Sequence, residues 1–396
     1  MIKRIFSKNE NKILLMLAFF SISVGLWGNF RQLWLEANCF SVSNISNIIS
    51  LGTFISVISI IFIGKYINAN KLKSLIAVTL LIKILNMFFL FRLNESLNTI
   101  IIAISIAVDI ITEYIIISSI YPLLTTILKN NTIYSKRKLT EYFFRDIGIF
   151  IGGLIIGKTI IGFTVNYNIC LFISMIFLIF SIIININLKI NNTSETYNKS
   201  RDSIIQYIFK SKIQVLYSIY TFVGAMAIST GLGLKMLTLT NYFSFSDSFA
   251  TNYLLIIGLF ADVFGMLALK FFTPKNDYIT ITIKFGIRFI AYVIAFISNN
   301  TFLTLIAITW SLFISTSYEN ICDGYYINSV KNEYQLSYTN FRYVIRFLGE
   351  AMGVFFCGLM FQCGLRYMFG LSSFFMIFQI ALAYYLIGLR KKESIN

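Results

Sequence analysis

The sequence predicts an all-α polytopic membrane protein with twelve transmembrane helices in two pseudo-symmetric six-helix bundles. Three observations support this fold class. Of 396 residues, 57% are hydrophobic and only 13% are charged, and the mean hydropathy is +0.76, which excludes an ordinary soluble domain. Many apolar runs reach the roughly 20 residues that a helix needs to cross the hydrocarbon core. Finally, two blocks of residues recur in the second half of the chain at nearly the same spacing.

Clusters of Lys, Arg, Asn and Gly separate the apolar runs and set the limits of the expected helices. The first run has no small-residue cleavage site and is too long for the core of a signal peptide, so we expect it to be retained. In chain order the expected spans are 12–35, 42–64, 74–91, 98–128, 139–163, 167–188, 212–236, 248–271, 278–297, 301–329, 336–362 and 366–389.

The distribution of cations predicts the orientation. With a cytoplasmic N-terminus, the inner segments carry 21 Lys and Arg residues, whereas the outer loops carry only Arg92 and Arg366. Positive charge stays on the cytoplasmic side of a membrane, so both termini are predicted to be cytoplasmic. The net charge of +16 is then mainly a topology signal that also favours anionic lipid, and we expect no nucleic-acid partner.

An internal duplication divides the chain. The pattern R-x2-G-x3-G-x4-G starts at Arg145 and again at Arg346, 201 residues later, on the fifth helix of each half. Asn47, Lys65 and Lys83 likewise recur as Asn252, Lys270 and Arg288 at a constant offset of 205. Two such blocks indicate related six-helix halves. The expected division is a first bundle at 1–190, a polar cytoplasmic linker at 191–211 and a second bundle at 212–396.

With these features the chain resembles the major facilitator superfamily of secondary transporters over essentially its whole length. The segment GKYINANKLKS at 64–74 is similar to the signature that the family carries between its second and third helices. Gly64 and Lys73 fit that signature, Asn68 replaces its aspartate, and its central Arg and Gly are missing. The resemblance implies a solute cavity near mid-membrane between the two halves, lined by helices 1, 2, 4, 5, 7, 8, 10 and 11, with the halves rocking around it.

Ionisable residues deep in the spans are the first candidate site residues, because a charge in hydrocarbon costs several kcal/mol unless it is paired or hydrated. Two carboxylate pairs stand one helical turn apart, Asp109 with Glu113 and Glu319 with Asp323. Mutual repulsion within such a pair favours binding of a proton, so these residues are candidates for proton or solute binding. The alternative is a fixed ion pair, for instance with Lys83 or Arg288.

Further solute-binding candidates are cations and tryptophans. Arg31 and Lys235 occupy similar places in their halves, shortly after the segments GLWGN and STGLG. Cations on both sides of one cavity suit an anionic or zwitterionic solute, although both could instead reach the outer headgroups. Trp27 lies one turn before Arg31, where it could stack on a ligand or on the guanidinium. Trp310 is a candidate cavity residue on the tenth span.

Charged residues on the fifth helix of each half are predicted to form a gate. Arg145 has Asp146 beside it, and Arg346 has Glu350 one turn further on. Such pairs could latch the halves together near the cytoplasmic side and separate when the protein opens inward, or they could be purely structural. The spacing GxxxG at 148–152 and 349–353 predicts close approach of neighbouring helices.

Missing residue types narrow the function further. The chain has no His, the usual general base and a common ligand of haem and zinc, and no GxxxxGK[ST] motif for ATP. Five scattered Cys suggest no metal cluster, so we expect no cofactor, no metal and no enzymatic activity.

The prediction is a monomeric plasma-membrane (inner-membrane) transporter that moves a small solute by alternating access and is coupled to protons. Uptake and export, and the identity of the solute, stay open. The alternative is a non-transporting membrane sensor or lipid-handling scaffold built on a transporter fold, which the altered signature at 64–74 favours.

Overall fold

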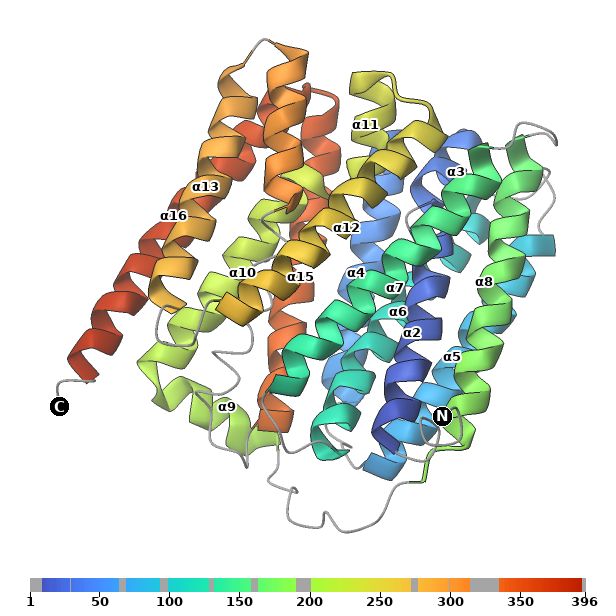
Figure 1. Cartoon of the computed structure of the whole chain (residues 1–396), viewed down its shortest axis with the longest axis horizontal. Helices are drawn as coiled ribbons and strands as arrows, with labels where there is room; N and C mark the ends of the chain where they lie inside the picture. The colour runs from blue at the N-terminus through green and yellow to red at the C-terminus, as the bar shows by residue number, and fades with distance from the viewer. Residues whose placement is uncertain are drawn as a thin grey trace.

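The computed structural model describes residues 9–28, 30–63, 69–92, 99–127, 132–157, 163–189, 201–271, 277–298, 300–313 and 335–393. These residues form a bundle of helices without any strand (Figure 1). The first half contains α2 (Asn9–Trp27), α3 (Arg31–Ala37), α4 (Val42–Ile63), α5 (Ala69–Arg92), α6 (Thr99–Ile127), α7 (Thr132–Gly157) and α8 (Phe163–Ile186). The second half follows the short α9 (Arg201–Lys210) and contains α10 (Lys212–Leu232), α11 (Lys235–Phe243), α12 (Asp247–Phe271), α13 (Asp277–Ile297), a helix at Thr301–Phe313, α15 (Gln335–Phe361) and α16 (Leu365–Glu393).

Most of the predicted spans agree with the described helices. Within the described residues, eight segments are long and apolar enough to cross a membrane. Three further apolar helices in the described part of the chain are shorter. The remaining predicted span is α7, whose first half carries several charged residues. The second part of the tenth predicted span, 314–329, lies outside the described residues.

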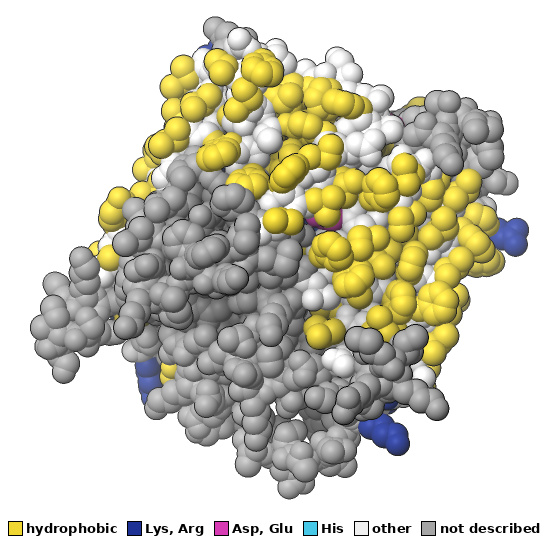
Figure 2. Space-filling view, viewed as in Figure 1, with side chains coloured by type: hydrophobic (Ala, Val, Ile, Leu, Met, Phe, Trp, Pro, Cys, Tyr) yellow, Lys and Arg dark blue, Asp and Glu magenta, His cyan; other side chains and the backbone are white. Residues whose placement is uncertain are grey.

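The outer surface is apolar where a membrane protein needs it to be. Large side chains such as Phe62, Ile100, Phe260 and Phe302 are at least 60% exposed, which would be unfavourable in water but is neutral against lipid tails. Figure 2 shows hydrophobic side chains over most of the visible described surface, with Lys and Arg at its margins. The helices are therefore held by packing and internal polar contacts, not by exclusion of water alone.

Helix pairing repeats between the halves. Helix α2 packs on α7 and α8, and α10 packs on α15 and α16 in the same way, while α5 on α8 corresponds to α13 on α16. Across the halves, α4 packs on α15 and α12 packs on α7. These two contacts exchange when α4 is matched with α12 and α7 with α15, as a pseudo-twofold axis between the halves requires.

Glycines bring the paired helices together at equivalent places, as predicted for GxxxG segments. At the α2–α7 crossing, a Cβ on Gly148 would lie 2.2 Å from the carbonyl oxygen of Ile22. At the α10–α15 crossing, a Cβ on Gly349 would lie 2.3 Å from the carbonyl oxygen of Phe222. Both distances are far below van der Waals contact with backbone atoms that cannot move aside easily.

We therefore expect Gly148→Val to force α2 and α7 apart and to lower stability. Overpacking of this kind costs about 1–3 kcal/mol, visible as a lower midpoint of thermal unfolding in detergent. Gly388→Ala on α16 is the matched control, because nothing lies within 4 Å of the added Cβ. An unchanged midpoint for Gly148→Val would show that the crossing relaxes without loss.

Two of the predicted spans are broken instead of continuous, which corrects the ranges 12–35 and 212–236. Helix α2 ends at Trp27 and α3 begins at Arg31, and α10 ends at Leu232 just before α11 begins at Lys235. Gly28 and Gly233 lie at the breaks. Glycine destabilises the interior of a helix relative to alanine, so these are positions where a helix ends readily. Each break leaves backbone groups that must be satisfied inside the membrane. Gln32 meets this need across the halves, because its Nε2 donates to the carbonyl of Gly233 at 3.1 Å.

Candidate functional site

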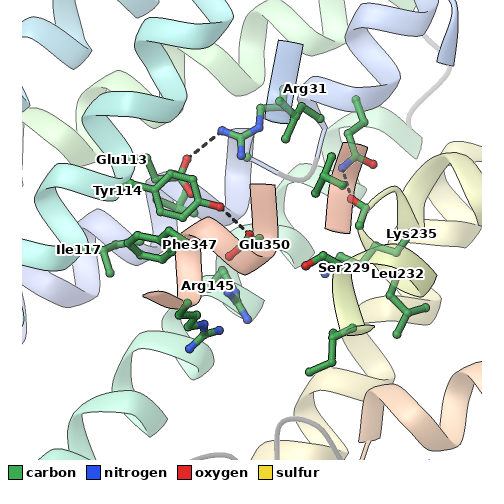
Figure 3. A pocket seen from close by; sticks show the side chains of 18 of the residues that line it. Arg31, Glu113, Tyr114, Ile117, Arg145, Ser229, Leu232, Lys235, Phe347 and Glu350 are labelled. Carbon is green, nitrogen blue, oxygen red and sulfur yellow. Dashed lines mark hydrogen bonds and ion pairs between the residues drawn. The ribbon is translucent and has the colours of Figure 1, made fainter. Parts of the chain in front are cut away.

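A polar cavity of about 300 Å³ lies between the two halves. Its wall comes from α2, α3, α4, α6 and α7 of the first half and from α10, α11, the helix Thr301–Phe313 and α15 of the second. The cavity begins at the two helix breaks and extends toward the end of the bundle that carries α9, as far as Glu141 on α7 and Tyr343 on α15. Its lining mixes charged, aromatic and aliphatic side chains (Figure 3).

Four charged residues of the first half form one buried network at the edge of this cavity. Arg31 contacts Glu113 at 3.0 Å and Asp109 at 3.4 Å. Lys83 on α5 contacts Asp109 at 2.5 Å and Glu113 at 3.8 Å. Two cations and two carboxylates therefore balance each other, which makes the burial of four charges tolerable in a membrane.

Asp109 lies at the centre of the network and away from the cavity. Its side chain is fully buried, and it accepts a hydrogen bond from the indole nitrogen of Trp27 at 3.0 Å in addition to its contacts with Lys83 and Arg31. The fixed ion pair with Lys83, one of the two sequence interpretations, is therefore the observed arrangement. The indole ring of Trp27 is buried beside that of Trp34.

Unlike Asp109, Glu113 lines the cavity. It lines the wall together with its neighbour Tyr114 and remains 8% exposed. Figure 3 shows the Arg31 guanidinium pointing toward it. Glu113 is thus a carboxylate with a strong ion pair on one side and a polar space on the other, where a proton or a solute could compete with Arg31.

A second carboxylate links the halves. The hydroxyl of Tyr114 on α6 donates to Glu350 on α15 at 2.6 Å, and the Tyr114 ring meets Phe347 edge-on at 4.2 Å between centroids. Glu350 thus connects its helix with the opposite half at the cavity. Arg346, one turn earlier, also lines the cavity.

The predicted gate residues on α7 point in different directions. Arg145 lines the cavity, with its guanidinium over the ring of Tyr142 at 4.6 Å. Asp146 is buried against Gly258 on α12, where an added Cβ would lie 2.4 Å from its carboxylate oxygen. Asp146 therefore sits at a contact between the two halves.

Lys235 enters the cavity from the other half. It is the first residue of α11 and lines the wall beside Ser229 and Leu232, as Figure 3 shows. Arg31 is likewise the first residue of α3. Both cations therefore line the cavity in the described structure.

The remaining sequence candidates lie elsewhere. Trp310 does not line the cavity; its side chain is 50% exposed and stacks on Phe313. Its helix turns this face outward. Glu319 and Asp323 lie outside the described residues.

Sequence reasoning missed several cavity residues, chiefly Gln32, Glu141, Tyr142, Tyr343 and Phe347. Aromatic and amide side chains are frequent in this chain, so their type carried no signal. Glu141 precedes Arg145 by one turn and could have been found from that spacing.

Three polar contacts between described residues join the halves at the end of the bundle that carries α3 and α11 (Figure 1). Besides the Gln32 bond, Asn241 on α11 donates to Glu36 on α3 at 2.9 Å, and Tyr167 on α8 donates to Asp247 on α12 at 3.0 Å. The halves are thus tied together by polar contacts on one side of the cavity.

No protein-family model and no curated protein matches the sequence. Among solved structures, the nucleoside transporter NupG is 13% identical with a TM-score of 0.68, covering 97% of this chain and 99% of that one. The Escherichia coli fucose:proton symporter FucP is 14% identical with a TM-score of 0.69, covering 95% and 98%. The human organic anion transporter MFSD10 is 11% identical with a TM-score of 0.67, covering 96% and 99%. Near-complete coverage of both chains means that the chain has the major facilitator superfamily fold.

Proposed function

We propose that this protein is a secondary active transporter that moves a small solute across the plasma membrane by alternating access, coupled to protons. The observation that carries the proposal is the polar cavity between two pseudo-symmetric halves, bounded on one side by cross-half hydrogen bonds. A cavity of about 300 Å³ is at the lower end of the range for ligand sites, roughly 300–1,000 Å³, and suits a small solute.

With the predicted topology, α9 lies on the cytoplasmic side and α3 and α11 lie on the outer side. The described state then corresponds to an inward-facing carrier, closed outside by the Gln32, Glu36 and Tyr167 contacts. The two rigid units are the halves 1–190 and 212–396, and the linker 191–211 joins them. Rocking of these units would break the outer contacts and close the cavity on the α9 side.

The coupling proposal depends on Glu113. In the described state the carboxylate of Glu113 is paired with Arg31. Of the two carboxylates in the network, Glu113 lines the cavity and Asp109 does not. Protonation would release Arg31 and change the balance of charge at the cavity. A proton and a conformational change are thereby linked at one residue.

The direct test is uptake by purified protein in proteoliposomes with an imposed pH gradient. We expect accumulation of at least one solute from a panel of sugars, nucleosides, amino acids and small organic acids, and we expect it to collapse when a protonophore is added. A correctly folded protein that moves none of them, in either direction, would contradict the proposal.

Alternating access predicts that the outer contact between Glu36 and Asn241 opens during transport. In a background without native cysteines, Glu36→Cys with Asn241→Cys should be joined by a short bismaleimide, and joining should stop uptake. Glu36→Cys alone, treated with the same reagent, is the matched control. Full uptake by the cross-linked protein would exclude movement at this contact.

A further inference from the structure

Lys235 is a cation at the cavity without an ion pair to any described residue. Arg31, the other cation discussed above, forms ion pairs with Asp109 and Glu113. Lys235 lines the same cavity and takes part in neither of these pairs. An uncompensated ammonium in a membrane interior is costly, so a protein that keeps one there uses it. Its side chain faces the cavity, not lipid.

Arg31 occupies the equivalent position in the first half but is paired. Both residues open the short helix after a glycine break, and both line the cavity. The first half supplies Arg31 with two carboxylates of its own. Lys235 has no such partner among the described residues, so an equivalent position in the second half is left for a negative charge from outside the protein.

The charges around Lys235 set the charge of that partner. Arg145, Asp146 and Glu350 are the charged groups whose fields act on its amine. Arg145 lines the same cavity and adds a second positive charge. Glu350 is committed to Tyr114 and Asp146 is packed against Gly258, so both repel an anion without blocking it. Over the whole described cavity wall, the cations are Arg31, Arg145, Lys235 and Arg346, and the carboxylates are Glu113, Glu141 and Glu350. This excess of one positive charge favours a single negative charge over two.

The aliphatic and aromatic residues of the cavity wall indicate the chemical character of the uncharged part of the solute. Leu232, Phe347 and Val354 line the same cavity as Lys235. They offer apolar surface in the same cavity as the cation, where the non-polar part of a solute can pack. Resting on the proposed function, we infer that the solute is a small monocarboxylate with an apolar body, whose carboxylate binds Lys235.

Binding can be measured on the full-length protein in detergent with benzoate and hexanoate and with their neutral amides, benzamide and hexanamide. We expect the carboxylates to bind and to raise the unfolding midpoint, and the amides to bind at least about tenfold more weakly, since truncating a desolvated charge pair typically costs more than this. Carboxylates that bind no better than their amides would overturn the inference.

Three variants assign the effect to Lys235. Lys235→Met should lose the preference for carboxylates by about tenfold or more, and Lys235→Arg should keep most of it. Lys12→Gln is the matched control, because Lys12 bonds a backbone carbonyl on the exposed surface. Undiminished carboxylate binding by Lys235→Met would overturn the inference. Without ligand, this variant should unfold at or above the wild-type midpoint, because an unpaired cation has been removed.

Glu350→Gln should change carboxylate affinity in the opposite direction from Lys235→Met. It therefore distinguishes an effect on binding from an effect on folding. It removes a negative charge near Lys235 while the amide oxygen can still accept the Tyr114 bond. We therefore expect carboxylates to bind severalfold more tightly, which a purely structural role of Glu350 does not predict. Weaker binding would contradict the assigned geometry.

The two proposals fail in different ways. If neutral solutes accumulate in proteoliposomes while no carboxylate binds, the transporter stands and the monocarboxylate inference is wrong. If carboxylates bind through Lys235 and nothing is moved across the membrane, the anion site stands and transport is wrong.

Discussion

Lys83→Met is expected to destabilise the protein more than any other single change named above. Met has nearly the same length, so the change removes the charge and leaves the packing. Asp109 then loses its 2.5 Å partner while it remains fully buried. Breaking a buried ion pair from one side costs about 3–5 kcal/mol. The measurement is the unfolding midpoint of the purified protein in detergent, together with its yield from membranes.

The design of the control follows from the network. Lys12→Met removes one positive charge at the exposed bond to Asn187 and should change the midpoint little. Adding Asp109→Asn to Lys83→Met should recover part of the loss, because the uncompensated carboxylate is gone while Arg31 and Glu113 keep their own pair. Losses that simply add would show that Lys83 and Asp109 do not act as a pair.

Glu113→Gln is expected to have the largest effect on activity. Uptake driven by a pH gradient should fall by tenfold or more, since a glutamine cannot carry the proton. Exchange of labelled for unlabelled solute at equal pH on both sides should persist, because it needs no net proton movement. Both rates are measured in the same proteoliposomes.

Glu141→Gln is the matched comparison, because Glu141 is another carboxylate of the same cavity wall. Glu141→Gln should reduce driven uptake and exchange equally, and should reduce driven uptake less than Glu113→Gln does. If Glu113→Gln lowers both rates equally, its carboxylate binds solute or holds structure and does not couple protons. If Glu141→Gln alone uncouples them, the proton path runs through α7.

Much of the fold could be predicted because the membrane restricts the choices. Spanning segments must be helical and of similar length, so apolar runs predicted their number, and the repeated Arg and Gly residues predicted related halves. Gly148 and Gly349 were predictable as packing residues because close helix approach tolerates few other side chains. The breaks at Gly28 and Gly233 were not predicted, since their freed backbone groups depend on partners from distant residues such as Gln32.

The candidate site was predictable only in part. Charged residues within apolar spans are rare enough to stand out, so Asp109 and Glu113 were candidates from their depth and Arg31 and Lys235 from their equivalent positions in the two halves. Arg31, Glu113 and Lys235 line the cavity, and Asp109 does not. Their roles could not be predicted, because a residue one position along a helix points about 100° away. Tyr114 and Glu113 are neighbours in sequence, yet one bonds the opposite half and the other bonds Arg31.

The sequence by itself determined that this chain is a helical membrane protein with a duplicated architecture, because hydrophobicity, helix length and internal repeats are local properties written along the chain. The tertiary structure alone decided which buried charges are neutralised within the protein and which face the cavity. That distinction depends on side chains from four or five helices meeting at one point: Lys83 and Arg31 satisfy Asp109 and Glu113, and Lys235 faces the space between the halves.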